Sequence, residues 1–206
     1  MIKFDSCATI SVEIQAGVDK FPAVERSKRW DGKAKAVVAF KKEIMRQGLE
    51  IQGHRCAWCT LEVGEKGRRS AHRDHVAPKS IHQVWTFNAK NLVISCEYCN
   101  GFLVKGDVDT VQVVNNVYEK CEFWVVHPYL DEVVKHISFW KADGASDILV
   151  KSHSDKGRWT VELFRLDTPE ATALRAKDYL HAEHLVGLTA RDEQLLKSAV
   201  GNLGKV

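Results

Sequence analysis

Two pairs of cysteines, each with two residues between its members, constrain this chain more than any other feature of its sequence. Cys56 and Cys59 form the first pair, Cys96 and Cys99 form the second, and 36 residues lie between Cys59 and Cys96. Four thiolates in two close pairs are typical of tetrahedral zinc, because each pair presents two sulfurs to one ion. The spacing therefore predicts a zinc site that closes the intervening segment into a loop.

Polar residues in and just after this loop carry groups suited to phosphodiester chemistry. Asp74 supplies a carboxylate for Mg²⁺ or Mn²⁺, and Asn100, directly after Cys99, supplies a neutral oxygen ligand. His75 is the expected general base, since an imidazole with a pKa of about 6.5 accepts a proton at neutral pH. Four thiolates leave no open position on the zinc, so we expect this ion to be structural and to fix Asn100 against the strand that carries Asp74.

Positive charge gathers in the half of the chain that holds the cysteines. Residues 1–106 hold 18 Lys and Arg against 11 Asp and Glu, a net charge of +7, whereas residues 107–206 hold 12 against 16, a net charge of −4. A basic surface beside a metal motif is suited to tracking a phosphate backbone. The basic residues nearest to Asp74 in the sequence are Lys66, Arg68, Arg69, Arg73 and Lys79.

The length and composition bound the class of protein. At 206 residues and 45% hydrophobic content, the chain can bury one sizeable core with room for a second small module. No apolar run reaches membrane-spanning length, and acidic residues stand where a signal peptide needs an apolar stretch. We therefore expect no membrane association and a cytoplasmic location, in which Cys7 and Cys121 are small buried thiols rather than disulfide partners.

The hydrophobic patterns and the cysteine spacing together predict an α+β fold in three parts: an N-terminal segment with a helix (1–50), the zinc-stabilised module that carries the motif (51–110) and a small α+β appendage (111–206). In the first two parts we expect a β-like stretch at 8–14, a helix from Asp31 to Gly48, strands at 70–76 and 91–95, and a helix at 98–105. In the appendage we expect extended segments at 137–140 and 148–152, a turn at 155–157 before a strand at 158–166, a helix at 169–186 capped by Thr168, and another helix from Thr189.

The motif residues, read together, match a known pattern: Cys-x-x-Cys, Asp-His-x-x-Pro-Lys-Ser, and Asn-Leu-x-x-Ser-Cys-x-x-Cys-Asn. This pattern closely resembles HNH endonucleases of the ββα-metal fold, in their four-cysteine zinc form, over residues 56 to about 106. The resemblance implies that Asp74 and Asn100 bind the catalytic Mg²⁺ or Mn²⁺ and that His75 is the base. It also implies that Asn91 steadies the loop between the two strands by hydrogen bonds.

One position departs from the family pattern. The family usually places a lysine three or four residues after the equivalent of Asn100, whereas Lys105 lies five residues after it. On a helix each extra residue turns a side chain by about 100°. The departure therefore argues against a role for Lys105 at the phosphate.

The C-terminal part carries a weaker likeness. Residues 127–131, His136-Ile137 and 157–175 resemble the tail of HNH proteins encoded with anti-phage defence systems of the Septu and retron-associated type. That resemblance implies an ABC-class ATPase partner. The prediction is thus a metal-dependent nuclease of such a system, with DNA favoured over RNA. The alternatives are a zinc-stabilised nucleic-acid-binding module without cleavage activity and a structural subunit for the ATPase.

Overall fold

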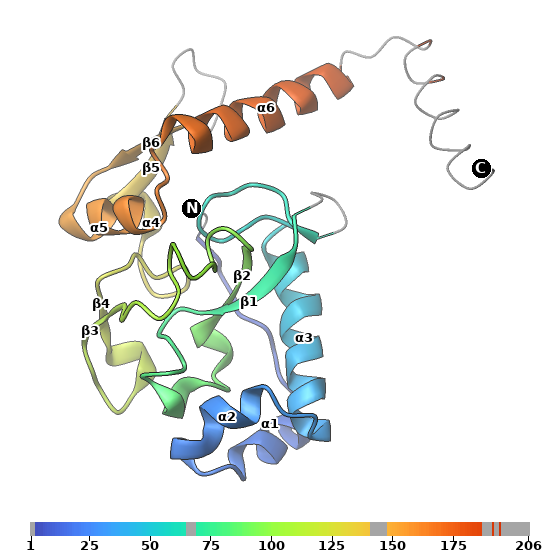
Figure 1. Ribbon diagram of the computed structural model, residues 1–206, viewed down its shortest axis with the longest axis vertical. Coiled ribbons are helices and arrows are strands. Elements are labelled where there is room, and N and C mark those ends of the chain that lie inside the picture. Colours follow the sequence, from blue (N-terminus) through green and yellow to red (C-terminus); the bar gives the residue numbers. More distant parts are fainter. Residues whose placement is uncertain (1–2, 65–68, 141–147, 187–190, 192–193, 195–206) are drawn as a thin grey trace.

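The chain folds around a central antiparallel hairpin, with helices at both ends of the molecule (Figure 1). The computed structural model describes residues 3–64, 69–140, 148–186, 191 and 194. In the N-terminal half the elements are α1 (Val12–Asp19), η1 (Ala23–Glu25), α2 (Arg26–Trp30), α3 (Lys35–Ile51), β1 (Ala71–His75), η3 (Gln83–Trp85), η4 (Ala89–Asn91) and β2 (Leu92–Cys96). They are followed by β3 (Val111–Val113), η5 (Tyr118–Lys120), β4 (Glu122–Phe123), α4 (Val133–His136), β5 (Ile137–Trp140), β6 (Leu149–Ser152), α5 (Asp155–Leu163) and α6 (Pro169–Val186).

The central hairpin confirms the two strands expected around the motif. β1 pairs with β2 in antiparallel register, with Asp74 opposite Val93. Every residue of β2 is buried, and α3 lies along the hairpin. Gly48 lets the helix approach closely, because a Cβ at that position would lie 2.7 Å from Cγ1 of Ile94. Gly48 therefore serves packing inside α3 rather than closing the helix as expected.

The N-terminal segment is more helical than its sequence pattern suggested. The β-like stretch expected at 8–14 is wrong, because Ser11 caps α1 and accepts a hydrogen bond from the Ile14 N–H at 3.4 Å. The longer helix starts at Lys35, and Asp31 is instead the residue that ends α2.

The helix predicted at 98–105 is also wrong: this segment forms a run of turns. The N–H groups of Val104 and Gly106 both donate to the carbonyl of Gly101 at 3.0 Å. Gly106 has a φ of +45°, which side chains rarely adopt, and a Cβ there would lie 2.9 Å from the Phe102 carbonyl oxygen. The structure therefore shows the two strands of the expected ββα unit and, in the described residues, no helix directly after them.

The C-terminal part confirms some elements and overturns one. β5 pairs with β6, with Ile137 opposite Ser152, as the two extended segments suggested. The strand expected at 158–166 is wrong: α5 covers most of it, because Ser154 caps this helix and accepts from the Gly157 N–H at 3.0 Å. α6 begins as predicted, with Thr168 accepting from the Ala171 N–H at 3.3 Å. The helix expected from Thr189 lies outside the described residues.

Part of the C-terminal region packs directly on the cysteine module. The ring of Phe164, just after α5, stacks on the indole of Trp58 with ring centroids 4.3 Å apart and an interplanar angle of 14°. Both side chains are fully buried. The segment after α5 is therefore part of the core around the motif.

None of the helices in the part of the chain that the structure describes combines the length and the apolar character that a membrane span requires.

Candidate functional site: a cysteine cluster beside a buried aspartate

The four predicted cysteines meet in the structure. One sulfur from each of Cys56, Cys59, Cys96 and Cys99 lies within 4.8 Å of the others, and all four residues are buried. The Cys59 and Cys96 sulfurs are 3.8 Å apart, too far for a disulfide. Zinc–sulfur bonds of about 2.3 Å in a tetrahedron put the sulfurs about 3.8 Å apart. The cluster thus has the donor chemistry and the spacing of a structural zinc site.

Backbone groups and burial shape the charge of this cluster. The Cys96 N–H points at the Cys56 sulfur at 3.3 Å, and the Cys99 N–H at the Cys96 sulfur at 3.4 Å. Hydrogen bonds from the other cysteines lower the pKa of Cys96, whereas burial raises the pKa of Cys56. Four sulfurs packed together away from water cannot all ionise without a cation, so the cluster has a physical need for one.

Asp74 is connected to this cluster through Trp58, and its buried carboxylate is held by protein donors. Its Oδ2 accepts from the Trp58 indole N–H at 2.8 Å, and its Oδ1 lies 2.9 Å from the Lys105 ammonium. The two charged side chains are 1% and 2% exposed. Lys105 also donates to the His75 carbonyl at 2.6 Å. Trp58, between the first two cysteines, and Lys105, after the last two, thus hold both oxygens of the expected metal ligand.

The divalent ion expected at Asp74 does not fit this arrangement. Mg²⁺ takes oxygen ligands in an octahedron and keeps several waters, which a carboxylate with both oxygens bonded to protein donors in the core cannot offer. Asn100 is half-buried in the turns after Cys99, where its own N–H donates to the Cys96 carbonyl at 3.0 Å. The groups bonded to the Asp74 carboxylate in the described residues are Trp58 and Lys105, and Asn100 makes no hydrogen bond to it.

His75 ends β1 with its ring held in one tautomer. Its Nε2 lies 3.0 Å from the Thr86 carbonyl oxygen, which can only accept, so Nε2 carries the proton of the neutral ring. Burial, together with the positive charges of Lys105 and Lys79, lowers the pKa of His75 to about 3. The Trp30 indole packs against the ring in an edge-to-face arrangement, with centroids 4.5 Å apart. Nδ1 is therefore the unprotonated nitrogen, and it has no hydrogen-bond partner among the described residues.

Asn91 ties together the loop that connects the two strands. Its amide NH₂ donates to the carbonyls of Ala77 and Trp85, both at 3.1 Å. Its Oδ1 accepts from the Ala77 N–H at 2.7 Å and from the Tyr118 hydroxyl at 2.9 Å. The side chain is fully buried and every one of its hydrogen-bonding positions is used. The loop carries Thr86, so these bonds also fix the carbonyl that orients His75.

A second histidine supports Asn91 from the C-terminal side. The Tyr129 N–H donates to Nδ1 of His127 at 3.2 Å, so the neutral His127 ring carries its proton on Nε2. That Nε2 lies 2.9 Å from the Tyr118 hydroxyl, which in turn donates to Asn91. Burial lowers the pKa of His127 to about 3, which keeps the ring neutral and the direction of the bonds fixed.

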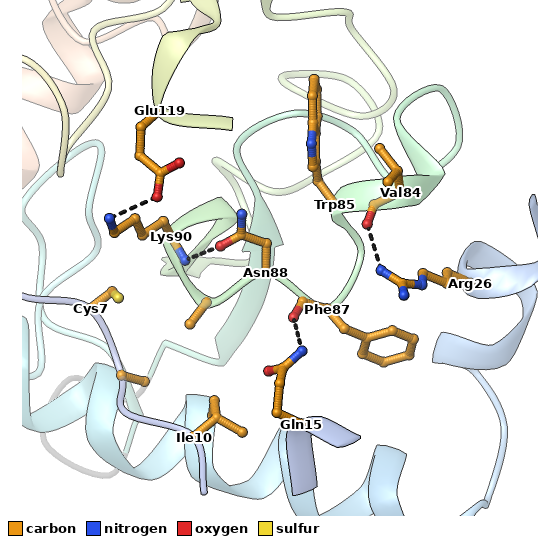
Figure 2. A pocket seen from close by; sticks show the side chains of 12 residues that line it. Cys7, Ile10, Gln15, Arg26, Val84, Trp85, Phe87, Asn88, Lys90 and Glu119 are labelled. Carbon is orange, nitrogen blue, oxygen red and sulfur yellow. Dashed lines mark hydrogen bonds and ion pairs between the residues drawn. The ribbon is translucent and has the colours of Figure 1, made fainter. Parts of the chain in front are cut away.

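The outer side of the same loop lines a pocket of about 420 Å³ (Figure 2). Its polar groups are engaged with the protein: Arg26 donates to the Val84 carbonyl at 2.9 Å, and Lys90 pairs with Glu119 at 2.8 Å. Arg26 and Glu119 therefore bind the outer side of this loop, while the buried Asn91 side chain binds its inner side.

A basic groove of about 630 Å³ lies along α3 and β1. Arg73 and His75 are two apart on β1 and so face one side of the hairpin, whereas Asp74 faces the other. The Lys41 ammonium lies 5.3 Å from the ring centroid of Trp30, which packs against His75. The groove thus lies on the side of β1 that His75 faces, and His75 itself is not one of its lining residues. Its lining residues are Val38, Lys41, Lys42, Met45, Arg46 and Arg73.

The other basic residues singled out in the sequence are less available. Lys79 lies 3.7 Å from Asp31, and Arg69 lies 3.5 Å from Asp178. Lys66 and Arg68 fall outside the described residues. By contrast, none of the acids in the described part of the chain pairs with Arg73 or with the exposed Lys42.

Trp58, Lys105 and Tyr118 are the site residues that sequence reasoning missed. Trp58 carried a signal in its place within the first cysteine pair, but an indole there reads equally well as core. For Lys105 the sequence showed only a lysine one or two residues later than the family motif places it. Tyr118 gave no signal, because its partner Asn91 is far away in the sequence.

Comparison with known proteins adds no relative. No protein-family model matches the chain, and a search of curated proteins found no significant match.

Proposed function

We propose that this chain is a nuclease that hydrolyses phosphodiester bonds in nucleic acid, DNA rather than RNA, with His75 as the general base. The observation that carries the proposal is the single free nitrogen of His75. Nε2 is committed to the Thr86 carbonyl, which leaves Nδ1 unprotonated at neutral pH and free to take a proton from water.

The groove beside His75 supports a nucleic-acid substrate. Arg73 is half-buried, its pKa is lowered by desolvation, and among the described residues it has no acidic partner. A half-buried cation without a counter-charge is costly, and a phosphate diester would offset that cost. A strand laid along Lys42 and Arg73 would approach His75 from the face on which the ring lies.

In this scheme His75 Nδ1 accepts a proton as water attacks phosphorus and forms the new P–O bond. The bond to the leaving oxygen breaks on the opposite side, and that oxygen keeps the electron pair and takes a proton from solvent. Burial alone would make the ring a weak base. The negative charge of a bound phosphate opposes the positive charges of Lys105 and Lys79, which raises the pKa of His75 when substrate arrives. No step here passes through an ion at Asp74, because the carboxylate is held by protein donors.

The test is cleavage of plasmid, single-stranded DNA and RNA, with Mg²⁺ or Mn²⁺ added to the zinc-loaded protein. We expect His75→Ala to lose about 10²-fold to 10⁴-fold in turnover while it keeps zinc and nucleic-acid binding. His72→Ala is the matched control, since His72 is half-buried on the same strand but on the opposite face. Near-normal turnover by His75→Ala would contradict the proposal.

The buried Asp74–Lys105 pair favours a second candidate, a zinc-stabilised module that binds nucleic acid without cleaving it. Such a module needs the cysteine cluster and the basic groove but no reactive centre. Tight binding by the wild-type protein, with no cleavage of any substrate under any ion condition, would support this candidate over the nuclease.

We also propose, from the sequence resemblance, that the nuclease serves anti-phage defence with an ABC-class ATPase. Figure 1 shows α6 extending away from the hairpin, and Leu174 and Leu180 on it are 39% and 52% exposed. Exposed leucines on a projecting helix suit a docking surface. If α6 is that surface, Leu174→Glu with Leu180→Glu will abolish co-purification of an ATPase from the native host without loss of zinc.

A further inference from the structure

The Lys105 ammonium occupies the position beside the Asp74 carboxylate that a metal ion would need. It lies 2.9 Å from Asp74 Oδ1 and donates to the His75 carbonyl at 2.6 Å. A carboxylate and a backbone carbonyl are also the oxygen ligands that hard metal ions take from proteins. The opposite carboxylate oxygen is closed by the Trp58 indole at 2.8 Å.

The turns after the second cysteine pair bring Lys105 to this position. Gly101 and Gly106 permit the tight turns, since a Cβ at either residue would lie 2.9 Å from a backbone oxygen. The N–H of Gly106 returns to the Gly101 carbonyl at 3.0 Å and folds the chain back toward β1. On a continuous helix the Lys105 side chain would point in a different direction. The turns at Gly101 and Gly106 therefore both prevent the expected helix and bring the ammonium to Asp74.

The charges of this pair balance without any ion. Each charge would be costly alone at 1% and 2% exposure, and together they satisfy one another. A divalent ion could reach Asp74 only if the ammonium left, and that would place Lys105 in the core without its partner. The two cations therefore exclude each other.

We propose that Lys105 is the resident cation of the Asp74 site and competes with divalent metal ions for it. Asp74 and Lys105 then act as positioning residues: they anchor the end of β1 and hold the His75 backbone, and neither touches substrate. This inference goes beyond the proposed function and holds whether or not the chain cleaves nucleic acid.

The test is a titration of zinc-loaded protein with Mn²⁺, in which the electron paramagnetic resonance signal of free Mn²⁺ measures how much of the ion is bound. Wild type and Asp74→Asn are expected to bind Mn²⁺ equally weakly. Lys105→Met removes the charge at similar length, and we expect its affinity for Mn²⁺ to rise on the order of 10-fold to 100-fold. The double variant Lys105→Met/Asp74→Asn should lose that gain, which shows that Asp74 supplies the new ligand.

Two results would overturn the inference. One is a wild-type Mn²⁺ site that Asp74→Asn abolishes, and this comparison needs no Lys105 variant, so it decides the matter even if Lys105→Met fails to fold. The other is a folded Lys105→Met protein that binds Mn²⁺ no better than wild type. Because the readout is ion binding, failure here is distinct from failure of the nuclease proposal, which His75→Ala tests by cleavage.

Discussion

The four-cysteine cluster and the Asp74 centre are both buried, charged and attached to the β1–β2 hairpin, yet they balance charge in opposite ways. The cluster gathers four sulfurs, and the buried Arg175 guanidinium acts on Cys59 electrostatically but donates to the Ile148 and Leu166 carbonyls. No ion pair in the described residues neutralises the sulfurs, so their charge calls for an external cation. The Asp74 centre contains its own cation in Lys105. An acidic or thiol group in a sequence is thus weaker evidence for a metal site when a lysine or arginine forms an ion pair with it in the folded protein.

Trp58 joins the two centres. It lies between the first two cysteines, donates to Asp74 and stacks on Phe164 from the C-terminal part. Folding of the segment that carries the first cysteine pair therefore also places a hydrogen-bond donor for Asp74, and packing of the segment after α5 holds that donor in position. The Asp74 centre depends on the cysteine cluster for its geometry although it needs no metal of its own.

Among the variants that test this contrast, removal of one cysteine ligand should have the largest effect on stability. Structural zinc contributes roughly 10 to 16 kcal/mol to the folding of small sites, so Cys96→Ser should lose the metal and unfold the module around the hairpin. Elemental analysis gives the zinc content, and circular dichroism gives the folded fraction. Cys7→Ser is the control, because Cys7 is a half-buried thiol outside the cluster. A folded, zinc-free wild type would remove the contrast between the two centres.

Separate removal of each partner should break the second centre. Asp74→Asn or Lys105→Met leaves one buried charge unpaired, so each should lower the free energy of unfolding by about 3 to 5 kcal/mol while zinc stays bound. The double variant leaves neither charge, and its loss should be smaller than the sum of the two. Urea denaturation of the four proteins measures this coupling. Additive losses would show that the two side chains do not act as a pair.

The link between the centres is tested by Trp58→Phe. The substitution keeps an aromatic ring against Phe164 but removes the N–H that Asp74 accepts. Loss of a hydrogen bond to a charged group should cost about 1.5 to 3 kcal/mol, with zinc content unchanged. Trp124→Phe is the control, since that indole is 44% exposed. Equal stability of Trp58→Phe and wild type would show that the Trp58 hydrogen bond does not couple the Asp74 centre to the cysteine cluster.

The smallest expected effect is on the pH dependence of stability, through the histidine behind Asn91. The pKa of His127 is about 3 in the folded protein because of burial, against about 6.5 in an unfolded chain. As the pH falls from about 6.5 toward 3, the unfolded chain binds the extra proton, so the free energy of unfolding decreases.

His127→Gln keeps a donor and an acceptor but no longer titrates, so its stability should change less steeply between about pH 5 and pH 6.5. Urea denaturation at several pH values measures the slope, with zinc content followed in parallel because acid also protonates the cysteine ligands. Equal slopes for the variant and wild type would mean that His127 is not held neutral by burial.

The sequence predicted the parts of the fold that depend on neighbours in the chain. The cysteine pairs, the two strands of the hairpin and the Thr168 cap of α6 follow from spacing, residue preference and capping within a few residues. The sequence misled where two local signals competed. Residues 158–166 alternate like a strand, but the Ser154 cap and close packing of Gly157 on His136 favour α5.

By itself, then, the sequence determined that four cysteines would gather, because ligand spacing is a local property and the chemistry of thiolates is the same in any fold. Only the tertiary structure decided what surrounds Asp74. Its partners Trp58 and Lys105 come from opposite sides of the sequence, and nothing local indicates that the turns after Cys99 will return an ammonium to β1. Charge compensation in a protein core depends on which side chains finally meet, and that is fixed only when distant segments pack together.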